Sequence, residues 1–280
     1  MNSRKFGCNL IPVLDAHVDD YRKGAFSAHI HKSNSGGAIR ITLGDLLNDS
    51  LKDMLSTLMA SIGIAATDCI LVVDLSDAAI SDSTTFSKFV AEWLSKLHDL
   101  GRWKRMIVEA SSYPTKNPAK PNSEKKTPRS EWLSWMQLVQ HDRSILEWAS
   151  FGDFGADHGQ IDFDGAGRTV THLRYATATD WIVGRGGDAI EGHDGTIHTV
   201  AKKILSAAEF MGEDYSAGDE FIARCADKDA SGNGSTWRWA NMVHHMTLVT
   251  SSVGELIGVP VERPKRSPRV KQLSLLTSDK

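Results

Sequence analysis

The chain has 280 residues, of which 41% are hydrophobic and 24% charged, as expected for a globular protein with one large α/β domain or two small ones. Its formal net charge of −3 excludes a general attraction to nucleic acid or to an anionic membrane, so such contacts would need local basic segments. No apolar run reaches the roughly 18 residues of a membrane-spanning helix, and no signal peptide is recognised. The three cysteines lack C-x-x-C spacing and are typical of reduced thiols, so we expect a cytoplasmic protein.

The first part of the chain alternates predicted strands with predicted helices. Short apolar segments predict strands, at residues 9–14, 38–42, 69–75 and 105–110. Apolar residues that recur at steps of three and four predict helices over 47–62 and from a cap at Ser83 or Thr84 to about residue 100. This order, with short connections, is typical of βαβ units and a parallel sheet.

The next segment, 111–128, contains four of the eight prolines and four lysines, which predicts a long loop rather than an element. Because it follows the carboxyl end of a strand, it could border an active site; an insertion without a role is the alternative. Further strands are predicted at 148–151, 172–176 and 181–183, and helices at 129–140, 196–210, from 216, and at 235–257. We expect a single barrel-like domain over 1–259 and a flexible basic tail over 260–280.

Acidic residues follow or close three of the predicted strands: Asp74, Glu109 and Asp153. In a parallel barrel these carboxylates would converge at one mouth, where they could bind a divalent metal such as Mg²⁺ or act as general acid and base. Arg174 could neutralise the charge of a substrate or transition state, so we take these four residues as candidate catalytic residues. A network of ion pairs that only fills the polar end of the barrel is the competing interpretation.

A second set of residues is predicted to bind substrate: Arg40, Arg185, Gly186 and His244. The glycine-rich turn at 184–188 follows a predicted strand, a position where phosphate groups are commonly held, although its spacing matches neither the P-loop nor the dinucleotide fingerprint. A plain tight turn is the alternative. His244 and its neighbour His245 point about 100° apart on a helix and cannot easily chelate one ion, but one of them could reach a site.

Several segments between residues 40 and 250 together carry a resemblance to a known family. They include Leu71-Val-Val-Asp74, Glu109-Ala-Ser-Ser-Tyr-Pro114, Phe151-Gly-Asp-Phe154 and His244-His245-Met-Thr. In these segments the chain resembles the "beta protein" family of phages and bacteria. The resemblance implies a TIM-barrel-like α/β barrel with C-terminal helices and an association with phage or prophage genes or with phage defence, but it brings no established reaction. Family members would place strand and helix units before Leu10, so we expect a barrel that is incomplete on its N-terminal side.

Two functions are compatible with these features. The first is a metal-assisted hydrolase that acts at the barrel mouth on a phosphate-containing substrate, a nucleotide or a nucleic acid. The second is a non-catalytic barrel that binds a phage or host protein as a regulator or as a component of phage defence. We also expect a second copy of the chain, or a separate polypeptide, to complete the edge near residues 10–14; closure within a monomer is the alternative.

Overall fold

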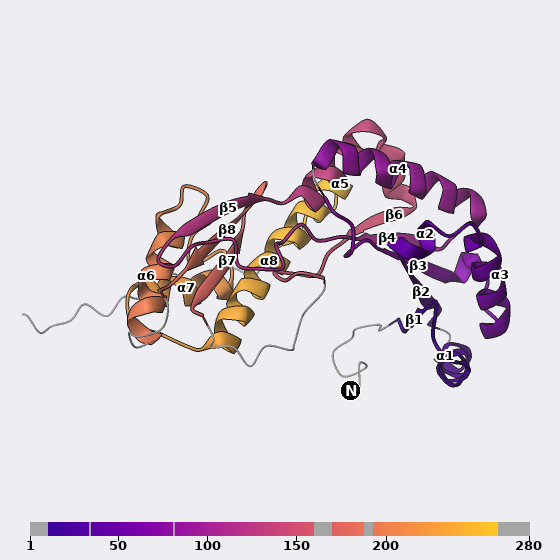
Figure 1. Cartoon of the computed structure of the whole chain (residues 1–280), viewed down its shortest axis with the longest axis horizontal. Helices are drawn as coiled ribbons and strands as arrows, with labels where there is room; N and C mark the ends of the chain where they lie inside the picture. Colours follow the sequence, from indigo (N-terminus) through magenta and orange to yellow (C-terminus); the bar gives the residue numbers. More distant parts are fainter. Residues whose placement is uncertain (1–10, 34, 81, 160–169, 188–192, 263–280) are drawn as a thin grey trace, which may run out of the picture. The chain divides into compact units, whose positions relative to one another are not determined.

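A computed structural model describes residues 11–33, 35–80, 82–159, 170–187 and 193–262 of the chain (Figure 1). The chain divides into two compact units, and the boundary between them falls inside the predicted domain 1–259. The parallel-sheet unit comprises the described parts of 1–116 and 128–165, and the hairpin unit comprises those of 117–127 and 166–280. Most of the predicted basic tail, 263–280, lies outside the described residues.

The parallel-sheet unit is built from strands and helices that alternate along the chain (Figure 1). Its five strands, in sheet order, are β1 (Val13–Asp15), β2 (Gly37–Thr42), β3 (Cys69–Asp74), β4 (Arg105–Glu109) and β6 (Ala149–Gly152). Its helices are α1 (Asp20–Ser33), α2 (Leu43–Leu46), α3 (Leu51–Ile62), α4 (Ser83–Leu100) and α5 (Ser130–His141), with 3₁₀ turns η2 (Ala66–Asp68) and η3 (Arg143–Glu147). All neighbouring strands pair in parallel, so the predicted parallel α/β architecture is confirmed.

The strand register gives this sheet an apolar face and a more polar face. One paired row crosses all five strands and is buried throughout: Leu14, Ile39, Leu71, Met106 and Ala149. Because successive side chains in a strand point to opposite faces, the adjacent row belongs to the other face, and it begins with Asp15 and Arg40. The two faces of this sheet therefore differ in polarity, and the polar face carries Arg40, Asp74 and Glu109 of the predicted site residues.

The hairpin unit contains a three-stranded sheet in the order β5 (Glu124–Pro128), β8 (Asp180–Arg185), β7 (His172–Ala176). Its helices are α6 (His193–Ser206), α7 (Ala217–Ala226) and α8 (Gly234–Ile257). Tyr175 and Ile182 from the sheet pack with Val200 of α6, Ile222 of α7 and Ala240 of α8 in one fully buried core. The predicted strands and helices of this region are present.

The expected TIM-barrel-like arrangement is not shown by the part of the chain that the structure describes, and no closed barrel is found there. β7 and β8 form an antiparallel hairpin joined by residues 177–179, whereas a parallel crossover needs a dozen or more residues. Two local predictions were also wrong. The predicted loop 111–128 contains the strand β5, and the helix α4 is capped by Asp82, which accepts a hydrogen bond from the Thr85 backbone N–H at 2.8 Å, rather than by Ser83 or Thr84.

Among the described helices, none combines the length and the apolar composition that crossing a lipid bilayer requires.

Candidate active site

The predicted site residues divide between the two units. Asp74 ends β3, Glu109 ends β4, Asp153 follows β6, and Arg40 lies in β2, all within the parallel-sheet unit. The other four, Arg174, Arg185, Gly186 and His244, belong to the hairpin unit. A single mouth that contains all eight therefore stays a prediction, and each group is described in its own unit.

The strand register brings the first group together at the carboxyl edge of the parallel sheet. Asp74 pairs with Thr42 on one side and with Glu109 on the other. Asp15 and Arg40 pair with each other two rows before the Asp74 row, and they share the Asp74 face because Arg40 stands two residues before Thr42. Parallel strands that end in register thus place one guanidinium and three carboxyl groups on one face of the sheet.

Arg40 links two of these carboxylates. Its Nε donates a hydrogen bond to Asp74 Oδ2 at 2.8 Å, its Nη2 contacts the same oxygen, and its Nη1 donates to Asp15 Oδ2 at 3.2 Å. Burial would lower the pKa of the guanidinium, but the hydrogen bond and charge of Asp74, together with Asp15 and Glu109, raise that pKa above its ordinary value. The Asp74 side chain is 1% exposed, and its other oxygen accepts the Ser76 backbone N–H at 2.8 Å. Asp74 is therefore fully engaged by protein groups.

Glu109 has fewer hydrogen-bond partners than its neighbours, and its pKa is raised. No hydrogen bond to its carboxyl group is found among the residues that the structure describes, and the group is only partly exposed. Burial raises the pKa of Glu109, and the negative charges of Asp74 and Asp153 raise it further, while Arg40 opposes the change. A carboxyl group that holds its proton more tightly than usual, and that lies beside a charge-paired carboxylate, has the properties of a general acid.

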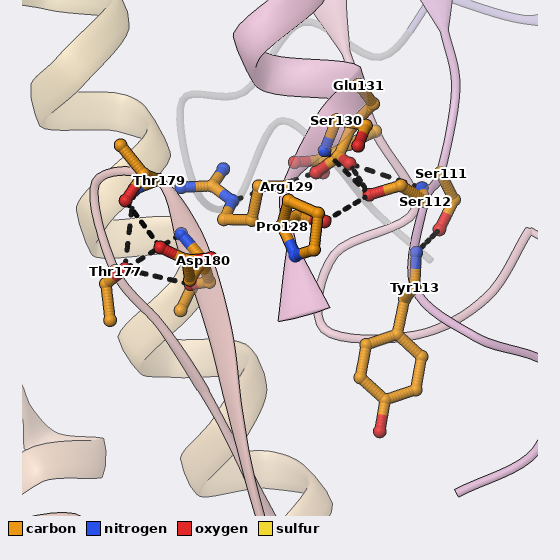
Figure 2. A network of polar contacts seen from close by, with 12 residues as sticks. Ser111, Ser112, Tyr113, Pro128, Arg129, Ser130, Glu131, Thr177, Thr179 and Asp180 are labelled. Atoms are coloured by element: carbon orange, nitrogen blue, oxygen red, sulfur yellow. Dashed lines mark hydrogen bonds and ion pairs between the residues drawn. The ribbon is translucent and has the colours of Figure 1, made fainter. Parts of the chain in front are cut away.

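A second polar network follows β4 and was missed in the sequence (Figure 2). The Ser112 hydroxyl contacts the Glu131 carboxyl group, the Ser112 backbone N–H donates to Glu131 Oε2 at 3.2 Å, and the Ser130 N–H donates to Ser112 Oγ at 3.0 Å. Burial raises the pKa of Glu131, against the charge of Arg129, whose Nε lies 3.7 Å from Glu131 Oε1. An acidic residue in the first turn of a helix ordinarily complements the helix dipole, so nothing in the sequence marked Glu131 as buried.

The same edge also includes a histidine that the sequence did not single out. His17 follows β1, and its Nε2 contacts Asp45 Oδ1. Burial would raise the pKa of Asp45, but hydrogen bonds from Thr42 and His17 lower it below its ordinary value. Among the described residues no group of three or more His, Cys, Asp or Glu side chains has the geometry to hold a metal ion. A divalent metal at this edge thus stays a prediction.

In the hairpin unit, His244 is part of the packed core. Its Nδ1 lies 3.0 Å from Asp219 Oδ2 and its Nε2 lies 2.7 Å from the Ala176 carbonyl oxygen, and the side chain is fully buried. The ring stacks on Tyr175, with 3.8 Å between ring centroids. Both ring nitrogens are therefore taken up within the protein, and the geometry gives no support to the predicted contact of His244 with substrate.

The glycine-rich turn is explained by close packing. A Cβ atom on Gly186 would lie 2.0 Å from the Thr196 side chain, so only glycine fits there. The Gly186 N–H donates to the Thr171 carbonyl oxygen at 2.8 Å, and is not available to an anion. Arg185 Nη1 donates to the Ala119 carbonyl oxygen at 3.3 Å, and the Arg174 N–H donates to Asn241 Oδ1 at 3.1 Å. These contacts favour the tight-turn alternative; Asp188 lies outside the described residues.

Comparison with known proteins gives one result. A family model described as Beta protein matches residues 1–251. No curated protein and no solved structure matches the chain. Because the match extends over most of the sequence, from the predicted N-terminal strand to the last helix, the chain belongs to the Beta protein family.

Proposed function

We propose that the parallel-sheet unit is a hydrolase in which Glu109 donates a proton to the leaving group of the substrate. The single observation that supports this most strongly is the Glu109 carboxyl group itself, which has a raised pKa and no hydrogen bond within the described residues, at the carboxyl edge of a parallel sheet. Ligands of open α/β sheets commonly bind at this edge. Residues with perturbed pKa values cluster at functional sites.

Asp74, which lies beside Glu109, makes a division into an acid and a base feasible. Asp74 is charge-paired with Arg40, while Glu109 has no such hydrogen-bonded partner within the described residues. Two nearby carboxyl groups with different environments are the usual arrangement for acid and base work in one site. As a proton donor Glu109 must be protonated, so the proposed activity decreases as pH rises through its raised pKa.

The charges at this edge bear on the substrate class. Asp15 and Asp74 share a single guanidinium, that of Arg40, so the cluster carries a net negative charge before Glu109 ionises. A neutral or cationic substrate would be accepted here, whereas an anion would be repelled. The phosphate-containing substrate expected from the sequence, and the association with phage defence, stay predictions to which these charges add no support.

A panel of chromogenic substrates tests the proposal. Glycosides, carboxylic esters, amides and phosphate esters would be compared at several pH values, with the wild-type chain, Glu109→Gln and Glu147→Gln. Glu147 is an exposed glutamate of the same unit, so its variant controls for the chemical change alone. We expect hydrolysis of a neutral member, a loss of about 100-fold or more in Glu109→Gln, and no loss in the control. Hydrolysis that survives in Glu109→Gln would contradict the role of this residue.

A different observation favours the second candidate function, binding of a protein partner. β1 is a terminal strand of the described sheet, it has three residues, and Val13 on it is 55% exposed. Strand edges of this kind can be extended by another chain. We propose that a second copy or another polypeptide pairs with β1. Light scattering combined with hydrogen exchange tests this: a monomer with strong amide protection at residues 13–15 would contradict it.

A further inference from the structure

The hairpin unit contains a groove that lies outside the candidate active site. It has a volume of about 430 Å³, a size typical of small-molecule sites. Its polar lining comes from one residue of β5 and from five of α6: Glu124, His198, Thr199, Lys202, Lys203 and Ser206. We call it the α6 groove. All of these residues belong to the hairpin unit, so the groove is defined without reference to the other unit.

The spacing along α6 explains why these side chains share one surface. His198, Lys202 and Ser206 are four residues apart and form one ridge of the helix, and Thr199 and Lys203 form the next. Eight residues of helix extend over about 12 Å, so the ridge could contact a ligand of that length. It presents an imidazole, an ammonium group and a hydroxyl group in a line.

The hydrogen bonds leave several donors available in the groove. Lys202 Nζ has no hydrogen-bond or ion-pair partner among the described residues. His198 Nδ1 lies 3.2 Å from the Cys225 carbonyl oxygen, which places the proton on that nitrogen and leaves Nε2 of the neutral ring as an acceptor for a hydroxyl group. Lys203 Nζ donates to the Asn122 carbonyl oxygen at 2.5 Å, which holds its ammonium group in place with two further protons to donate.

The ends of the groove limit what it can bind. The helix α6 ends at Ser206, and Glu209, just beyond it, forms an ion pair with Lys126. The row of basic side chains therefore does not continue past the end of α6. A nucleic acid would need a longer basic surface. On the β5 side, Glu124 offers a carboxylate that can accept hydrogen bonds from hydroxyl groups.

We propose that the α6 groove binds a small phosphorylated molecule that also carries hydroxyl groups, as a sugar phosphate does. The phosphate contacts Lys202 and Lys203, and the hydroxyl groups contact Glu124 and His198. This site is independent of the proposed chemistry at Glu109, since it uses other residues in the other unit.

Isothermal titration calorimetry with ribose 5-phosphate, ribose and inorganic phosphate tests the proposal on the full chain. We expect saturable binding of ribose 5-phosphate, weaker binding of phosphate and none of ribose. Lys202→Gln should weaken ribose 5-phosphate binding about tenfold or more. Glu124→Gln should weaken ribose 5-phosphate binding while leaving phosphate binding unchanged. Lys88→Gln, at an exposed lysine of α4, and Glu109→Gln should bind like wild type.

Three results would overturn the proposal. They are the absence of saturable ribose 5-phosphate binding into the millimolar range, equal binding by wild type and Lys202→Gln, and equal affinities for ribose 5-phosphate and phosphate. Far-UV circular dichroism of each variant confirms that it is folded, which is expected because Lys202 and Glu124 are exposed.

Discussion

Removal of the Asp219 carboxyl group should strongly destabilise the hairpin unit, because three buried donors depend on it. It accepts hydrogen bonds from Tyr175 Oη at 2.8 Å and from Ser216 Oγ at 2.5 Å, and it faces His244 Nδ1 at 3.0 Å. These side chains come from β7, from the cap of α7 and from α8, and Asp219 is fully buried. The carboxylate therefore joins three elements of the unit.

The expected loss in free energy of unfolding follows from the number of donors that would lose their hydrogen-bond partner. Each buried donor left unsatisfied costs about 1–3 kcal/mol, and entry of water into the vacated space offsets part of the sum. We predict that Asp219→Ala lowers the free energy of unfolding by about 3–5 kcal/mol, which is the cost of three unsatisfied donors less the part that water offsets. Asp219→Asn keeps the side-chain shape and one acceptor oxygen, so its loss should be about 1–2 kcal/mol.

Urea unfolding followed by circular dichroism measures both variants against the wild type. Glu255→Ala, at an exposed glutamate of α8, is the matched control and should change the free energy of unfolding by less than about 0.5 kcal/mol. If Asp219→Ala were as stable as this control, or if alanine and asparagine at residue 219 had the same effect, the Asp219 carboxylate would not join these elements as described.

The other predictions concern the stability of Gly186 and Glu109 variants and the reactivity of two buried cysteines. Gly186→Ala should lower the free energy of unfolding by about 1–3 kcal/mol in the same urea assay, because its Cβ would lie 2.0 Å from Thr196. Burial raises the pKa of Cys69 to about 12 and that of Cys225 to about 11, so iodoacetamide should modify neither thiol in the folded chain at about pH 8, and mass spectrometry should detect both modifications in urea. The raised pKa of Glu109 means that the folded state binds this proton more tightly than the unfolded chain, so ionisation of Glu109 costs stability as pH rises through that pKa. Glu109→Gln should therefore unfold at higher urea concentration than wild type at about pH 7, and the difference should shrink below the ordinary pKa of 4.5; a difference that grows in acid would contradict this sign.

Strands buried on both faces were predictable, and exposed elements were not. β3 was found because its residues form a continuous apolar run, as sheet burial requires. β5 was missed because four of its five residues are exposed and it contains two lysines, which are common on edge strands. The polar helix α1 was missed because its buried residues are Phe26 and Ile30 alone, too few to give a helical pattern. The connection over residues 177–179 is too short for a parallel crossover and therefore indicates an antiparallel hairpin. The expectation of a barrel took precedence over this indication.

The candidate site was also predictable only in part. Asp74 and Glu109 could be placed side by side from sequence because each ends an apolar strand, and parallel strands in register align their ends. The contact between Ser112 and Glu131 depends on how the chain between them returns to the start of α5, which periodicity does not specify. The role of His244 could not be assigned from sequence, because a histidine in a core resembles a histidine in a site until its partners, Asp219 and Ala176, are known.

Carboxyl ¹³C NMR titration of the Glu109 side chain measures whether Glu109 holds a proton available for transfer. We expect an apparent pKa above the ordinary value of 4.5 in the wild-type chain. We also expect a lower pKa in Asp153→Asn, which removes one of the negative charges that raise it, while Glu147→Gln should have no effect. A Glu109 pKa at or below 4.5 in the folded wild-type protein would rule out Glu109 as the proton donor.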